Sequence, residues 1–94
     1  MTRLKRLEKD IQKSVELFER VVRLNQKAIK AKSNIVYSFA YSCGNNGICF
    51  NIMDSADGFT LLNGCRDHYL GETTYGTPLE DIEKEIAEEE KKYD

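Results

Sequence analysis

Four side chains in the sequence belong to the types that most often bind metals or act as nucleophiles. They comprise three thiols and the single imidazole of the chain, with the spacing C-x5-C-x15-C-x2-H: Cys43, Cys49, Cys65 and His68. Only the last two have a spacing that is common among zinc ligands. The strand pairing predicted below also places Cys43 and Cys49 on opposite faces of a sheet. We therefore predict no metal site and no cofactor.

Cys65, Asp67 and His68 also bring a thiol, an acid and a base together within four positions. A cysteine nucleophile requires a histidine about 3 Å from its sulfur and an oxyanion site opposite. Closeness in sequence does not supply this geometry, and no nucleophile elbow surrounds Cys65. We therefore expect a protein that is not an enzyme, in which the cysteines pack as small apolar residues.

A second group of residues suits binding rather than catalysis. It combines amides at a hairpin tip with a later segment of charged and aromatic residues, namely Asn45, Asn46, Arg66, Asp67, His68, Tyr69 and Tyr75. Tyrosine and arginine are enriched in interfaces because they offer a large amphipathic contact area and directional hydrogen bonds. We expect these residues to form a rim at one end of the sheet.

Charge is segregated along the chain. Residues 1–33 hold ten Lys or Arg against four Asp or Glu, whereas residues 34–94 hold four against twelve. The basic residues lack interleaved aromatic residues, so we expect no nucleic-acid binding. The simplest interpretation is that the acidic C-terminal segment partly neutralises a basic helix. Its cluster Glu88, Glu89 and Glu90 would also suit a basic surface on a protein partner.

A long amphipathic helix is predicted over residues 3–32, with Thr2 as its N-cap. Neither Gly nor Pro interrupts it, and apolar residues recur at steps of three and four: Leu4, Leu7, Ile11, Val15, Phe18, Val21, Val22 and Ile29. A helix of this length measures about 45 Å, whereas a strand of eight residues measures about 27 Å. The end that carries Leu4 and Leu7 must therefore extend beyond any sheet that the helix covers.

This extension predicts a homodimer, in which the same helix of a second copy covers the exposed apolar residues. We do not expect a dedicated coiled coil, because both heptad seams contain polar residues. One seam consists of Leu4, Ile11, Phe18 and Asn25, and the other consists of Leu7, Ser14, Val21 and Ala28.

From Asn34 to Cys65 the apolar period changes to two, which predicts antiparallel strands. Asn46-Gly47 favours a two-residue hairpin turn that pairs Tyr41 with Ile52. A register shifted by one residue would turn the apolar side chains of the second strand to the other face. The pattern therefore selects the register in which the apolar faces match.

The remaining elements follow from turn and capping signals. Residues 55–58 predict a second turn, and residues 59–65 a third strand of a meander. Residues 66–76 suit either a loop or a short edge strand. Thr77-Pro78-Leu79-Glu80 resembles a capping box, with Thr77 as the N-cap of an acidic C-terminal helix.

The sequence therefore predicts one α+β domain over residues 1–94: a long N-terminal helix on a three-stranded antiparallel meander, then a short acidic helix. No apolar run is long enough to span a membrane, and the charged start lacks the apolar run of a secretory signal, so we expect a cytoplasmic protein.

Small size, segregated charge and the lack of cofactor motifs are typical of small phage-type inhibitors or regulatory adaptors. We expect a non-catalytic protein that binds a protein partner through its acidic helix or its rim. The alternative is a homo-oligomer that binds a small anionic, nucleotide-like ligand between subunits. Its candidate contacts are Arg66, His68, Tyr69, Tyr75 and Asn45.

Overall fold

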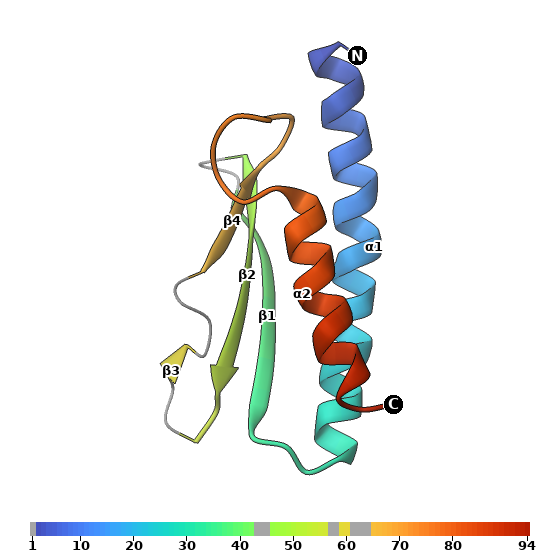
Figure 1. The fold of residues 1–94 in the computed structure, drawn as a ribbon, viewed down its shortest axis with the longest axis vertical. Coiled ribbons are helices and arrows are strands. Elements are labelled where there is room, and N and C mark those ends of the chain that lie inside the picture. Colours follow the sequence, from blue (N-terminus) through green and yellow to red (C-terminus); the bar gives the residue numbers. More distant parts are fainter. Residues whose placement is uncertain (1, 43–45, 57–58, 61–64) are drawn as a thin grey trace.

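The structure is a computed structural model that describes residues 2–42, 46–56, 59–60 and 65–94. Its elements in chain order are α1 (Arg3–Lys30), β1 (Ile35–Ser42), β2 (Gly47–Asp54), β3 (Phe59–Thr60), β4 (Arg66–Tyr69) and α2 (Leu79–Lys91). The two helices lie side by side over one face of the sheet (Figure 1). The predicted α-β-β-β-α order is confirmed, with the third strand divided into two short pieces.

Helix α1 begins and ends close to the predicted residues. Thr2 is its N-cap, and the Thr2 Oγ1 atom accepts a hydrogen bond of 3.2 Å from the backbone N–H of Lys5. The helix ends at Lys30, and Lys32 has a left-handed backbone with φ of 56° that turns the chain toward β1. The molecule measures 44 Å along its longest axis, close to the length of about 42 Å expected for 28 helical residues.

The predicted faces of the first hairpin are confirmed, but the predicted register is wrong. Tyr41 pairs with Ile48 rather than with Ile52, so every partner is displaced by four residues. An even displacement keeps each side chain on its predicted face, which explains why the apolar faces still match. Pairing ends at Ser42 and Gly47, so Gly47 belongs to β2 and not to a two-residue turn. The pairing predicted for Cys43 lies outside the described residues.

The third strand consists of β3 and β4, which both pair with β2. Thr60 of β3 pairs with Met53, and His68 of β4 pairs with Ile48. The segment 66–76, left open between loop and strand by the sequence, contains both: four residues form β4, and a loop then leads to α2. Of the predicted strand 59–65, residues 61–64 lie outside the described part.

Helix α2 starts one residue later than the capping box predicts. Pro78 is the N-cap, and no side chain caps the helix. Thr77 does not act as the N-cap because its backbone is bound to β4. Its N–H donates to the carbonyl of Asp67 at 2.6 Å, and its carbonyl accepts from the ring of His68 at 2.9 Å.

The core lies between the sheet and the two helices, with Phe50 fully buried in β2. The other buried members of the core cluster come from the sheet and from both helices: Leu17, Val21, Leu24, Ala28, Tyr37, Ile48, Ile52, Leu79, Ile82 and Ile86. Strand alternation turns Val36, Ala40 and Met53 to the opposite face of the sheet. In the part of the chain that the structure describes, neither helix covers that face (Figure 1).

Ion pairs between the two helices support the predicted neutralisation of the basic helix by the acidic one. The guanidinium of Arg20 contacts Glu83 at 3.2 Å and Glu90 at 2.6 Å. Lys13 contacts the same Glu83 carboxylate, and Lys27 lies 3.6 Å from Asp94. Part of the basic charge of residues 1–33 is therefore paired with acidic side chains of the same molecule.

The Arg20 pairs predict a loss of stability at acidic pH. Hydrogen bonds from Arg20 hold the pKa of Glu90 below its ordinary value. Such a carboxylate stabilises the fold fully above its unfolded pKa of about 4.3, and this contribution is lost as the pH falls through the lower folded pKa. Urea unfolding from about pH 6 to pH 3 should show a smaller loss for Arg20→Met than for the wild type. A Lys30→Met control should follow the wild type, and an unchanged profile in Arg20→Met would refute the prediction.

Candidate functional site

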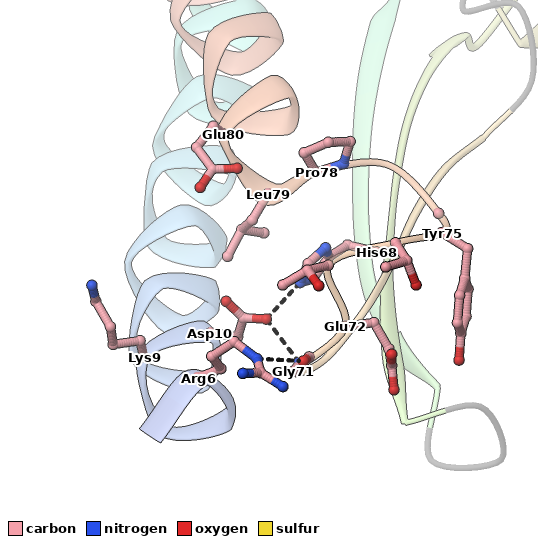
Figure 2. Close-up of a pocket in the computed structure, with 13 residues that line it drawn as sticks. Arg6, Lys9, Asp10, His68, Gly71, Glu72, Tyr75, Pro78, Leu79 and Glu80 are labelled. Carbon is pink, nitrogen blue, oxygen red and sulfur yellow. Dashed lines mark hydrogen bonds and ion pairs between the residues drawn. The ribbon is translucent and has the colours of Figure 1, made fainter. Parts of the chain in front are cut away.

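The segment between β4 and α2, residues 70–78, lies beside the N-terminal half of α1 (Figures 1 and 2). We call it the rim loop. Its first residue is held to the hairpin, because the N–H of Leu70 donates to the carbonyl of Asn46 at 3.0 Å. Its last part is held to β4 through both backbone groups of Thr77. The loop is therefore anchored at both ends.

A contact between partly buried Asp10 and buried His68 fixes the start of the loop to α1. His68 is 4% exposed, and among the described residues it is the one polar side chain that is buried. Its Nδ1 donates to the Thr77 carbonyl, which can only accept, while Nε2 lies 2.7 Å from Asp10 Oδ2, within hydrogen-bond distance. The same Oδ2 accepts the N–H of Gly71 at 2.8 Å (Figure 2). One carboxylate thus joins α1, β4 and the rim loop.

Two further contacts hold the loop against the first turns of α1. The Nε of Arg6 donates to the carbonyl of Gly71 at 3.2 Å, and Arg3 lies 3.7 Å from Glu72. Gly71 has a φ of 81°, and a Cβ at this position would lie 3.7 Å from the Cβ of Leu7. The rim loop therefore covers Leu7, which was expected to need a second copy, whereas Leu4 stays 64% exposed.

The anchored loop displays an aromatic pair. The ring centroids of Tyr69 and Tyr75 are 5.3 Å apart and the rings are tilted by 51°, an arrangement typical of attractive aromatic contacts. Gly76, with a φ of 79°, allows this packing, because a Cβ there would lie 2.8 Å from the Tyr69 ring and 2.9 Å from the Asp67 carbonyl. Tyr75 nevertheless remains 59% exposed.

A cavity of about 510 Å³ opens between α1, the rim loop and the start of α2 (Figure 2). Its lining comprises Arg6, Lys9, Asp10, His68, Gly71, Glu72, Thr73, Thr74, Tyr75, Gly76, Pro78, Leu79 and Glu80. Three carboxylates oppose two cationic side chains, and Arg6 is already bonded to the loop. The cavity is therefore mixed in charge rather than strongly attractive to an anion.

The structure brings together most of the predicted rim residues. Asn46, Asp67, His68, Tyr69 and Tyr75 all belong to the rim loop or contact its anchors. His68, however, is an internal anchor rather than an exposed contact.

One predicted residue does not join the rim. Arg66 lies toward the helices, and its Nε donates to Glu85 of α2 at 2.8 Å. Replacement of Arg66 would therefore disturb the packing of α2 as well as any ligand. Asn45 lies outside the described residues.

The acidic cluster of α2 is largely used inside the molecule. Glu89 accepts the hydroxyl of Tyr37 at 2.8 Å, and Glu90 is bound by Arg20. Burial, followed by hydrogen bonds to Tyr93 and Glu89, raises the pKa of Tyr37, so this phenol remains a donor. Glu88 is exposed. A partner would meet one carboxylate of this cluster rather than three.

The residues considered for nucleophilic chemistry point to different faces. Cys49 pairs with Asp67 on the open face of the sheet, whereas His68 points toward the helices. Burial, with hydrogen bonds to Cys65 and Asp67, raises the pKa of Cys49 to about 12, so its thiol is poorly nucleophilic at neutral pH. Cys65, Asp67 and His68 therefore do not assemble into a catalytic triad.

The ligand spacing that was considered for zinc, and rejected, is not assembled among the residues that the structure describes. No group of three or more His, Cys, Asp or Glu side chains there is placed to hold a metal ion. Cys43 lies outside this part of the chain.

Sequence reasoning missed Asp10, Arg6 and the two glycines of the loop. A signal for Asp10 exists in the pattern, because it lies seven residues before Leu17 and fourteen before Leu24, both fully buried in the core. An acidic residue in line with core positions indicates a buried polar partner.

Comparison with protein-family models, curated proteins and solved structures gave no match. Within the described ranges, no helix is long and apolar enough to cross a membrane.

Proposed function

We propose that this chain is a small non-catalytic binding protein that inhibits or regulates a protein partner through its rim, meaning Asn46, Tyr69 and the rim loop. One observation carries this proposal: the loop is held by α1, β4 and the hairpin, yet it presents Tyr75 to solvent. A loop that is already ordered loses little conformational entropy on binding, and an exposed tyrosine is a typical anchor of an interface. His68, the single histidine of the chain, is one of the side chains that hold the loop in place.

The acidic helix is the less supported surface for this function. Glu89 and Glu90 already bind groups of their own chain, so a partner would have to displace Tyr37 or Arg20 to reach them. The small-ligand alternative also has less support, because Arg66 is held by Glu85 and the cavity beside the loop contains three carboxylates. The rim requires no such displacement.

The test is site-specific photocrosslinking in the native host cells. A benzophenone amino acid at position 75 should give a discrete adduct with a protein, whereas the same group at exposed Lys84 of α2 should not. Once that partner is purified, Tyr75→Ala should weaken its binding by about tenfold or more, as expected for a tyrosine anchor. Equal adducts from both positions, or unchanged affinity of Tyr75→Ala, would refute the proposal.

A further inference from the structure

Helix α1 has a second apolar stripe that faces away from the core. The side chains at these positions are between 42% and 75% exposed: Leu4, Ile11, Val15, Phe18, Val22 and Ile29. They make up six of the nine exposed large apolar side chains among the described residues. The steps from Ile11 to Val22 are four, three and four residues, which is the spacing of a helix–helix seam. The stripe therefore runs along the whole helix.

A groove of about 480 Å³ lies beside the middle of this stripe. It is lined mainly by apolar side chains of α1 and β1, among them Val15, Phe18 and Phe39. Phe18 and Phe39 also contact each other, with ring centroids 6.2 Å apart. An exposed apolar surface of this kind is unusual on a monomer and indicates an interface.

Pairing through the neighbouring strand edge is restricted. The side chain of Asn25 donates to the carbonyl of Tyr37 and accepts from its N–H, both at 2.8 Å. Ser33 likewise accepts the N–H of Ile35 at 3.1 Å. These contacts occupy the free edge of β1 over its first half, so another chain cannot extend the sheet along the whole strand. The helix stripe is the more accessible surface.

We propose that the stripe binds the same stripe of a second copy, with the two α1 helices antiparallel. In one register Val15 lies opposite Phe18 of the second copy, and the symmetry axis passes between residues 16 and 17. The same register brings Ile11 opposite Val22 of the second copy. It also places Leu4 opposite Ile29 of the second copy, and these are the two most exposed members of the stripe.

Charge favours the antiparallel over the parallel arrangement. Glu8 continues the seam spacing between Leu4 and Ile11, so parallel helices would place two Glu8 carboxylates face to face. The antiparallel register places Glu8 opposite Asn25 of the second copy and opposes the two helix dipoles. The stripe is thus complementary to itself, which is what a two-fold dimer interface requires.

The first test is the mass of the full chain in solution by sedimentation equilibrium at about 100 µM. The wild type should have twice the monomer mass of 10.8 kDa. Val15→Glu should be monomeric with an unchanged circular dichroism spectrum, because Val15 is half exposed. Val36→Glu, a charge at a similarly exposed valine on the open face of the sheet, should remain dimeric. A monomeric wild type, or a dimeric Val15→Glu, would overturn the proposal.

A disulfide cross-linking experiment tests the direction of the helices. Leu4→Cys and Ile29→Cys are made separately in a variant whose three native cysteines are replaced by serine. On oxidation the mixture should form a covalent dimer, whereas each protein alone should not. Covalent dimers of each protein alone would show parallel helices, and no dimer in the mixture would exclude the proposed register. These results do not depend on Tyr75, so they separate failure of the dimer from failure of the rim.

Discussion

Replacement of Asp10 by alanine is expected to lower the free energy of unfolding by about 3 kcal/mol and to release the rim loop from α1. The Asp10 carboxylate is the hydrogen-bond partner of His68 Nε2 and accepts the N–H of Gly71. Its removal leaves a ring nitrogen without its partner in a side chain that is 5% exposed. Breaking one side of such a pair costs more than an ordinary surface contact does, because the remaining polar atom belongs to a side chain that is largely removed from water.

Urea unfolding and hydrogen exchange together measure this effect. Asp10→Ala should exchange the Gly71 amide much faster than the wild type, since that amide loses its acceptor. Asp10→Asn should lie between the two, because an amide oxygen can still accept from Gly71 while the charge is lost. Glu8→Ala, at an exposed position of the same helix, is the control and should change stability little. If Asp10→Ala behaves like Glu8→Ala, the pair does not anchor the loop.

Phe50→Ala should be still more destabilising, by about 4 kcal/mol. Phe50 is 0% exposed and lies in the central strand, beneath both helices. Removing its ring creates a cavity that rigid neighbours on the sheet and two helices cannot fill. A chain of this length has a total stability of about 5 to 14 kcal/mol, so the variant should be close to unfolding at room temperature.

Chemical denaturation of Phe50→Ala should show a much lower midpoint with a similar slope. Met53→Ala is a suitable control, because Met53 belongs to the same strand but points to the open face and is partly exposed. Its loss should stay below about 1.5 kcal/mol. A loss smaller than about 2 kcal/mol in Phe50→Ala would show that the helices do not pack on β2 as described.

The helices and the faces of the first hairpin were predictable because they depend on local periodicity. The apolar steps of α1 and the alternation of β1 are visible in any short window of the sequence. The register was not predictable from the same pattern, since a displacement by four residues preserves every face. Asn46-Gly47 favoured the tighter turn, but Gly47 pairs with Ser42 at the end of the ladder instead.

The candidate site was harder to predict because its contacts join distant parts of the chain. Tyr69 and Tyr75 were recognised by type, and the structure places their rings together. Asp10 and His68 are separated by 58 positions, so no local pattern predicts their contact. The same holds for Arg66 and Glu85, whose pairing removes Arg66 from the rim. Sequence identified the residues suited to binding, but not those that hold them in place.

The contact of Asn25 with Tyr37 also bears on the order in which the chain can fold during synthesis. The two residues are twelve positions apart, so α1 and β1 can meet before β2 has been made. A newly formed strand without partners is prone to pair with other nascent chains. Because Asn25 of the preceding helix binds one edge of β1, the backbone groups of the opposite edge are the ones that stay unpaired until β2 has formed. The amide side chain therefore occupies the backbone groups of Tyr37 with which another nascent chain would otherwise pair.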